Sequence, residues 1–238
     1  MMNIIRILKN VAYKTDYTKL DTLEIKEITE SSTNVKEDSL FIAIKGYKSD
    51  GHAYIDDAVE KGAAAIIGED QISNLSVPYI QVENSRKALA NIASNFYNNP
   101  SRKKKLIGIT GTNGKTTTSY LIKHILEESG KSCSLIGTIE TIINGEKDNS
   151  INTTPGAFML NQLLDRSKDE FVILEASSHG LSQYRLEGIK FDICLFLNLS
   201  HEHLDYHDSI EAYFETKALL FKKLKDNGVA IINTDNNW

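Results

Sequence analysis

The segment that most restricts how this chain can fold is a glycine-rich loop between an apolar run and a helical pattern. The loop covers residues 111–117, Gly-Thr-Asn-Gly-Lys-Thr-Thr, and follows the apolar run 106–109. Glycines let the backbone approach phosphates, while successive N–H groups and a helix N-terminus supply positive potential. Lys115 would reach the β and γ phosphates and Thr116 would contact Mg²⁺. The loop therefore predicts a strand–loop–helix unit that binds a nucleotide, which we interpret as ATP.

The spacing of this loop departs from the usual phosphate-loop pattern. Ile109 stands five residues before Gly114, at the place where the first glycine is usual. A glycine-rich turn before a helix is the alternative interpretation. The Gly-Lys-Thr-Thr sequence favours phosphate binding over that alternative.

From residue 106 onward, short apolar runs alternate with helical patterns. Strands are expected at 106–109, 134–136, 171–174, 193–197 and 229–232. The helix after the loop is expected to turn Leu121, Ile122, Ile125 and Leu126 inward. This alternation predicts an α/β fold with a mainly parallel sheet of the P-loop ATPase type, flanked by helices. Ligands of such sheets bind beyond the carboxyl ends of the strands, where the polar motifs of this chain lie.

The first 98 residues show shorter, mixed elements. Strands are expected at 40–44 and 63–67, with helices at 53–61 and from Asn84 or Ser85 onward. The sequence Asn-Asn-Pro-Ser at 98–101 then interrupts the pattern, since proline and the residue before it resist helix. We therefore predict a small mixed α/β domain at 1–98 and a second domain at 103–238.

The composition excludes several classes of partner. The net charge is −5 and the isoelectric point about 5.7, which argues against nucleic acid. The two cysteines, Cys133 and Cys194, form no C-x-x-C motif, so a reducing compartment is favoured. No run has the length of a membrane span or of a signal-peptide core. A cytoplasmic monomer without a membrane or nucleic-acid partner is expected.

A lysine stands among the apolar residues of the last helical pattern. That helix is expected to begin at Asp208 and to reach Leu224, with Lys217 between Phe214 and Phe221 on the apolar face. One interpretation is a lysine that lays its stem on the core and keeps its amine in water. The other is an amine held inside a site, where desolvation lowers the pKa. A neutral amine can add carbon dioxide to give a carbamate, which binds metals.

Carboxylates and histidines form two further candidate sites. Glu175 ends an expected strand, where a carboxylate opposite a phosphate loop suits magnesium, with a solvated loop acid as the alternative. The segment 201–207, His-Glu-His-Leu-Asp-Tyr-His, lacks the H-E-x-x-H pattern of zinc sites because Asp205 replaces the second histidine. We therefore favour one histidine as a Mg²⁺ ligand or an orienting group over a zinc site.

Five motifs taken together resemble the Mur ligase family. They are the loop at 111–117, Asn-Thr-Thr-Pro at 152–155, Glu-Ala-Ser-Ser-His-Gly at 175–180, Asn-Leu-Ser-His-Glu-His-Leu-Asp at 198–205, and Tyr-Phe-Glu-Thr-Lys at 213–217. The Glu-x-Ser-Ser-His-Gly-Leu motif resembles the MurE branch most. Segments 39–44 and 46–51 resemble the uridine-binding first domain of that branch, so the resemblance covers nearly the whole chain.

The resemblance implies a role for individual residues. The residues that would hold ATP are Gly111, Thr112, Asn113, Gly114, Lys115, Thr116 and Thr117. Thr116 and Glu175 would bind one Mg²⁺, and His203 with carbamylated Lys217 would bind a second, so the carbamate becomes the preferred interpretation of that lysine. The residues expected at the UDP are Ser32, Tyr47, Lys48 and Ser49. Those expected at the muramoyl peptide are Asn152, Thr153, Thr154, Ser177, Gln183 and Arg185. The expected catalytic set is Lys115, Glu175, His203 and Lys217.

The implied reaction is ATP-dependent amide ligation. A carboxylate of UDP-MurNAc-L-Ala-D-Glu would attack the γ-phosphate, and the amine of a diamino acid would displace phosphate from the resulting acyl phosphate. Two alternatives remain: another Mur or folylpolyglutamate-type ligase, and a module that only binds ATP and the UDP-substrate.

Two departures from the family pattern affect the details. Ser31-Ser32-Thr33 stands where the family has Asp-Ser-Arg near the uridine. The third, ligase domain of the family, which selects the amino acid, is not expected within these 238 residues. The sequence therefore leaves open whether meso-diaminopimelate or L-lysine is added.

Overall fold

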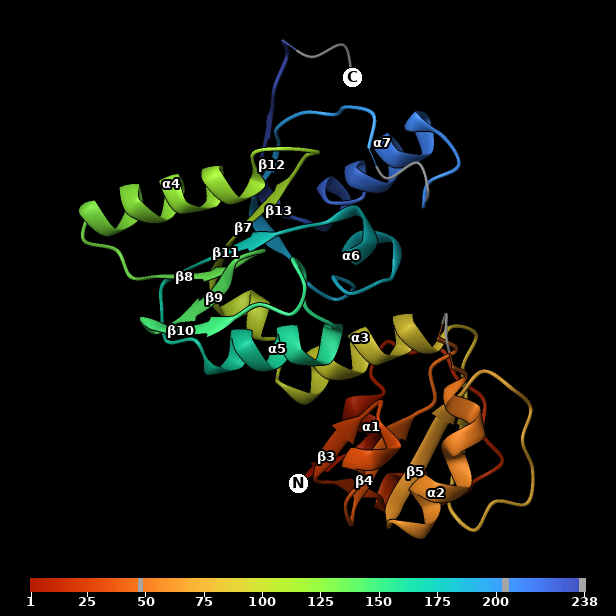
Figure 1. The fold of residues 1–238 in the computed structure, drawn as a ribbon. Helices are drawn as coiled ribbons and strands as arrows, with labels where there is room; N and C mark the ends of the chain where they lie inside the picture. The colour runs from red at the N-terminus through yellow and green to blue at the C-terminus, as the bar shows by residue number, and fades with distance from the viewer. Residues whose placement is uncertain (47–48, 203–205, 236–238) are drawn as a thin grey trace. The chain divides into compact units, whose positions relative to one another are not determined.

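The computed structural model describes residues 1–46, 49–202 and 206–235. The chain divides into two compact units, Met1–Asn98 and Asn99–Trp238. Each unit has its own sheet and its own apolar core (Figure 1). Among the described residues, no helix combines the length and apolar character needed to cross a membrane.

The first unit is built on a parallel sheet with the order β3-β4-β5-β6. The strands are β3 (Glu27–Thr29), β4 (Ser39–Ile42), β5 (Ala63–Gly68) and β6 (Tyr79–Gln81), with a separate antiparallel pair of β1 (Met2–Asn3) and β2 (Glu24–Ile25). The helices are α1 (Ile4–Ile7), α2 (Ile55–Glu60) and α3 (Ser85–Phe96), with 3-10 turns η1 (Leu20–Thr22), η2 (Ser32–Asn34) and η3 (Gly51–Tyr54). Asn84 caps α3 as expected, since its Oδ1 accepts from Lys87 N at 2.8 Å.

The second unit contains a seven-stranded sheet with the order β10-β9-β8-β11-β7-β12-β13. The strands are β7 (Lys105–Thr110), β8 (Cys133–Ile136), β9 (Glu140–Ile143), β10 (Glu146–Asn149), β11 (Phe171–Glu175), β12 (Phe191–Phe196) and β13 (Leu224–Ile232). The helices and turns are α4 (Lys115–Glu128), α5 (Ala157–Arg166), α6 (Ser178–Ser182), α7 (Ile210–Ala218), η4 (Pro100–Lys103) and η5 (Phe221–Lys223). β9 pairs antiparallel with both β8 and β10, and the other four strand pairs are parallel, so the predicted mainly parallel α/β sheet is confirmed.

Helices cover both faces of this sheet because its strands are apolar on both sides. Ile107 and Ile109 of β7 point to the face that α4 covers with Ile122 and Leu126. Leu106 points to the opposite face, where α5 contributes Leu160, Leu163 and Leu164 (Figure 1). The site described below lies at the carboxyl ends of the central strands.

The register of the central strands brings three chain segments to one edge. Ile109 of β7 pairs with Glu175 of β11 on one side and with Leu195 of β12 on the other. The phosphate loop, Glu175 and the segment after β12 therefore leave the sheet side by side.

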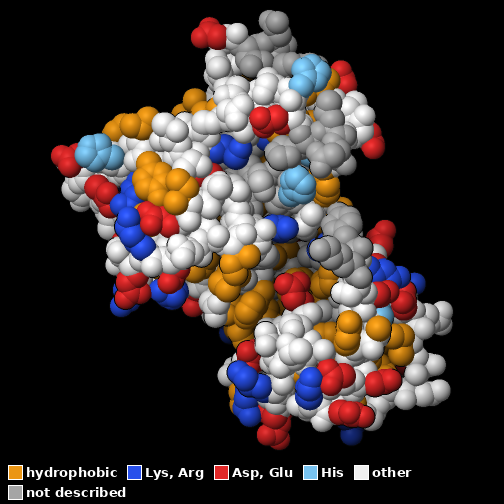
Figure 2. Space-filling model, viewed as in Figure 1, with side chains coloured by type: hydrophobic (Ala, Val, Ile, Leu, Met, Phe, Trp, Pro, Cys, Tyr) orange, Lys and Arg blue, Asp and Glu red, His pale blue; other side chains and the backbone are white. Residues whose placement is uncertain are grey.

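The prediction that α4 turns four apolar residues inward is wrong for two of them. Leu121 is 57% exposed and Ile125 is 62% exposed, whereas Ile122 and Leu126 pack on the sheet. The helix contacts the sheet along one narrow stripe, and residues 121 and 125 lie outside it. Figure 2 shows hydrophobic side chains on the surface over α4.

The last helix differs from its prediction at both ends. Its cap is Ser209 rather than Asp208, because Ser209 has extended backbone and its Oγ accepts from Ala212 N at 3.1 Å. The helix ends at Ala218, and Leu224, expected on it, instead begins β13. The inward position of Lys217 was predicted and is confirmed by its 1% exposure.

The hairpin of β9 and β10 was not predicted. Asn144 and Gly145 form its turn with φ of 56° and 82°. Positive φ at both central residues is the geometry for which Asn-Gly is favoured in two-residue hairpins. The Asn-Gly dipeptide is therefore the sequence signal that could have predicted this hairpin.

Candidate active site

The phosphate loop joins β7 to α4 through glycines with left-handed backbone. Gly111 has φ of 149° and Gly114 has φ of 82°, and a Cβ on Gly111 would lie 3.1 Å from the Leu197 Cβ. No side chain among the described residues caps the first N–H groups of α4. Uncapped N–H groups at a helix start are the kind of donors that can bind a phosphate.

Residues after β12 hold the loop in shape. Asn198 accepts from Thr112 N through its carbonyl and from Asn113 N through Oδ1, both at 3.0 Å. Ser200 N donates to Thr112 Oγ1 at 3.0 Å. The sequence motif that begins at Asn198 thus supports the loop from its neighbouring strand.

Lys115 lies across the loop that it belongs to. Its Nζ donates to Gly111 O at 2.8 Å and to Thr112 O at 2.9 Å. Burial lowers the pKa of Lys115, and the negative charges of Glu175 and Glu202 partly oppose that shift. The amine is positioned within the loop that would surround the phosphates.

Glu175 is a fully buried carboxylate at the end of β11. It accepts hydrogen bonds from three hydroxyls, Thr116 Oγ1 at 3.1 Å, Ser119 Oγ at 3.2 Å and Thr138 Oγ1 at 2.8 Å. A buried carboxylate beside the hydroxyl of a phosphate loop offers the oxygen ligands that Mg²⁺ prefers. This donor set fits a magnesium ion better than zinc, which favours nitrogen and sulfur ligands.

Lys217 is buried with its amine inside the protein. Its Nζ donates to Gly111 O at 2.9 Å and lies 4.4 Å from the ring centre of Tyr213. Burial lowers the pKa of Lys217 to about 7, and the positive charge of Lys115 adds to the shift. A snorkelling lysine would keep its amine in water, so the structure contradicts that interpretation. Neutral amine is therefore abundant at neutral pH.

Several of the expected peptide-side residues are linked to the main chain of Glu175 by hydrogen bonds. Thr154 Oγ1 donates to Glu175 O at 2.8 Å and accepts from Ser177 N at 2.9 Å. Arg185 donates to Thr154 O at 2.7 Å and to Gln183 Oε1 at 2.8 Å. Asn152, with Ile151, Pro155 and Met159, lines an adjoining cavity of about 450 Å³.

The residues expected at the UDP lie in the first unit or outside the described residues. Ser32 O accepts from Lys61 Nζ at 3.2 Å, and Ser49 O accepts from Gly46 N at 3.0 Å in a tight turn. Tyr47, Lys48 and the expected metal ligand His203 lie outside the described residues.

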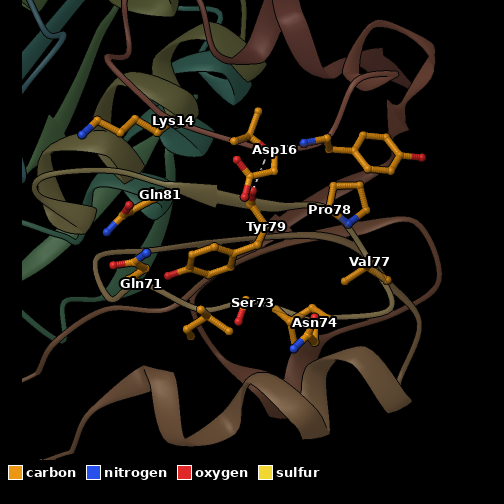
Figure 3. Close-up of a pocket in the computed structure, with 13 residues that line it drawn as sticks. Lys14, Asp16, Gln71, Ser73, Asn74, Val77, Pro78, Tyr79 and Gln81 are labelled. Carbon is orange, nitrogen blue, oxygen red and sulfur yellow. Dashed lines mark hydrogen bonds between the residues drawn. The ribbon is translucent and has the colours of Figure 1, made fainter.

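The first unit also holds a cavity of about 560 Å³ that the sequence did not indicate. It lies between residues 14–17 and the loop 71–78, with Tyr79 and Gln81 along it (Figure 3). The Tyr79 hydroxyl donates to Asp70 O at 2.6 Å, which fixes the ring. Neither Ser32 nor Ser49 lines this cavity.

Two protein-family models match this chain and identify its family. The model of the Mur ligase middle domain matches residues 109–238, and the model described as Mur ligase family, catalytic domain, matches residues 24–97. The chain belongs to the Mur ligase family. The family resemblance inferred from the motifs is thereby confirmed.

Named relatives within the Mur ligase family are similar along the whole chain. The UDP-N-acetylmuramoyl-L-alanyl-D-glutamate–2,6-diaminopimelate ligase of Caldanaerobacter subterraneus subsp. tengcongensis is 41% identical over 241 residues, covering 100% of this chain and 49% of the relative. The ligase of the same name from Clostridium tetani is also 41% identical, covering 97% of this chain and 49% of the relative. The chain spans about half the length of the curated relatives it matches.

Solved Mur ligase structures share the fold. A UDP-N-acetylmuramoyl-L-alanyl-D-glutamate–2,6-diaminopimelate ligase superimposes with a TM-score of 0.77 at 29% identity, covering 92% of this chain and 45% of that one. MurF of Thermotoga maritima, solved in complex with ADP, gives a TM-score of 0.63 at 27% identity, covering 88% and 46%. The Mur ligase fold of this chain is therefore shown by structure as well as by sequence.

Several residues of this Mur ligase site were missed by sequence reasoning. Ser119 and Thr138 contact Glu175, and Gly137 leaves no room for a side chain, since a Cβ there would overlap Glu175 Oε1. Tyr213, whose ring centre lies 4.4 Å from the Lys217 amine, was given no role of its own within the motif 213–217. The Gly-Thr sequence directly after an apolar run was the one signal for Thr138.

Proposed function

We propose that the protein is an ATP-dependent ligase that joins UDP-MurNAc-L-Ala-D-Glu to a diamino acid. The relatives named above support 2,6-diaminopimelate as that amino acid. The observation that carries the proposal is the buried carboxylate of Glu175, which lies 3.1 Å from the Thr116 hydroxyl. The amines of Lys115 and Lys217 both donate to Gly111 O in the same loop. A nucleotide-sugar substrate and ATP would place the reaction in the cytoplasm.

The loop and Lys115 would bind the ATP phosphates. On binding, the amine of Lys115 would exchange its bonds to Gly111 O and Thr112 O for the β and γ phosphates. Thr116 and Glu175 would hold Mg²⁺, which neutralises phosphate charge when bound. The N–H groups at the start of α4 add fixed positive potential at the same place.

The chemistry would proceed in two displacements. A carboxylate oxygen of the D-glutamyl group attacks the γ-phosphorus, the bond to the bridging oxygen breaks, and ADP leaves. The amine nitrogen of the second substrate then attacks the acyl carbon, loses a proton, and phosphate leaves. Lys115 would stabilise the charge on the transferring phosphoryl group. Thr153, Ser177 and Arg185, at the same sheet edge as Glu175, would position the peptide.

Lys217 would act as a carbamate. Its neutral amine would attack carbon dioxide and lose a proton, which changes a buried neutral amine into an anion. That anion, with His203, would supply ligands for a second Mg²⁺. The burial of the amine and its pKa of about 7 support this role.

The test is phosphate release by the full natural chain. We expect release that requires ATP, UDP-MurNAc-L-Ala-D-Glu and 2,6-diaminopimelate together, and that falls at least 100-fold in Lys115→Met, because a phosphate-binding lysine acts directly on the transition state. The matched control is Lys123→Met, a lysine two turns further along the same helix that pairs with Glu127.

The same assay separates the alternatives. Turnover with a UDP-muramoyl tripeptide but not with the dipeptide would indicate a MurF-type ligase. Binding of ATP and dipeptide without any release of phosphate would indicate a binding module and contradict the proposal.

A further inference from the structure

Thr138 stands between the proposed metal ligand and the segment expected to hold the peptide. Its Oγ1 is 2.8 Å from Glu175 Oε2 and 3.1 Å from Thr153 Oγ1, and the geometry makes Thr138 the donor in both contacts. A threonine hydroxyl carries one proton. Thr138 can therefore donate fully to Glu175 or to Thr153, but not to both at once.

The surrounding backbone is built so that this contact can form. Thr138 follows β8, which pairs with β11, and Gly137 beside it leaves the space that Glu175 Oε1 fills. The segment with Thr153 is linked to β9, since Thr141 Oγ1 lies 3.2 Å from Ser150 Oγ. The two acceptors of Thr138 thus belong to separate segments of the chain.

Thr153 and Thr154 contact Glu175 in different ways. Thr154 donates to the main-chain oxygen of Glu175, a contact that a ligand on the carboxylate leaves intact. In the hydrogen bonds of the described residues, Thr153 reaches the carboxylate through the Thr138 hydroxyl. Among the described contacts, that hydroxyl is the side-chain link between the carboxylate of Glu175 and the segment 150–154.

We propose that Thr138 is a positioning residue that couples binding of metal and nucleotide at Glu175 to binding of the peptide substrate at Thr153. When a cation occupies the oxygen lone pairs of Glu175, the proton of Thr138 turns to Thr153 and fixes the orientation of that hydroxyl. The peptide then meets an ordered Thr153, and binding of each ligand favours the other. This inference rests on the proposed ligase function.

The test is a binding cycle on the full natural chain by isothermal titration calorimetry. Its ligands are the Mg²⁺ complex of a non-hydrolysable ATP analogue and UDP-MurNAc-L-Ala-D-Glu, each titrated with and without the other. In the unsubstituted protein we expect each ligand to tighten the other on the order of tenfold. Thr138→Val should reduce that factor to about twofold or less, because valine keeps the shape without the proton. Thr138→Ser keeps the hydroxyl and should therefore retain the tenfold coupling between the two ligands.

Thr118→Val is the matched control, since Thr118 lies in α4 and none of the described hydrogen bonds joins its hydroxyl to Glu175, Thr138 or Thr153. Full coupling in Thr138→Val, or equal loss of coupling in Thr118→Val, would overturn the inference. If the unsubstituted protein binds both ligands without coupling, the inference alone fails. If it binds neither, the proposed function fails as well.

Discussion

Lys217 shows at the scale of one residue how a functional group opposes stability. Its side chain is 1% exposed, and burial lowers the pKa of its amine from 10.5 to about 7. Between these two values the unfolded chain binds a proton that the folded chain does not, so this residue makes the folded state more stable as pH rises from 7 to 10.5. Below pH 7 the amine is charged in both states, so the folded state bears the full free-energy cost of burying a cation.

This difference predicts the behaviour of Lys217→Met in buffer free of carbon dioxide. Methionine fills similar space without charge, so the variant should be more stable than the unsubstituted chain by about 2–4 kcal/mol at pH 7, with the gain shrinking toward pH 10. Urea unfolding across that pH range measures the difference. The variant should also lose ligation. If the free energy of unfolding differs between the two proteins by the same amount at every pH, a lowered pKa for Lys217 is contradicted.

The site residues differ in how far the sequence could reveal them. Lys115 and Thr116 follow from local spacing, because a phosphate loop is one continuous segment. Ser119 and Thr138 do not, since their role depends on which strand lies beside β11. The sheet order places β11 between β8 and β7, so Glu175 faces the phosphate loop on one side and Thr138 on the other. Apolar runs predict strands but carry no information about strand order.

At the scale of elements, α4 distinguishes apolar residues that pack from apolar residues that do not. Leu121 and Ile122 are neighbours in sequence, yet Leu121 is 57% exposed while Ile122 packs against the face of β7. Helical periodicity places Leu121 and Ile122 near the apolar stripe of α4. It cannot tell how wide the stripe is, and so which of the two residues packs on the sheet. The central strands were predictable because their runs are apolar throughout, whereas the end of α7 at Ala218 was not.

A pair of alanine substitutions in α4 tests this assignment. Leu121→Ala should change the free energy of unfolding by less than about 0.5 kcal/mol, because the side chain is already in water. Ile122→Ala should cost about 2 kcal/mol, because it removes packed methyl groups from the interior. Urea titrations followed by circular dichroism measure both. Equal losses in the two variants would show that the face of α4 is assigned wrongly.

At the scale of the whole molecule, each of the two units carries part of the expected ligase. The second unit brings the loop, Glu175, Lys217 and the peptide-side residues to one sheet edge. The first unit carries Ser32 and Ser49, and the match to the Mur ligase family extends over both units. The family and fold were predictable because several short motifs occur together in order. The contacts around the carboxylate of Glu175 required the structure.

The central claim, that the carboxylate of the substrate is activated by the phosphate bound at residues 111–117, has a direct isotopic test. The full natural chain is supplied with ATP, 2,6-diaminopimelate and UDP-MurNAc-L-Ala-D-Glu whose reacting carboxylate is labelled with oxygen-18. An acyl phosphate transfers one carboxylate oxygen to phosphorus, so mass spectrometry should find one labelled oxygen in each released phosphate. Amide formation with unlabelled phosphate would contradict this account.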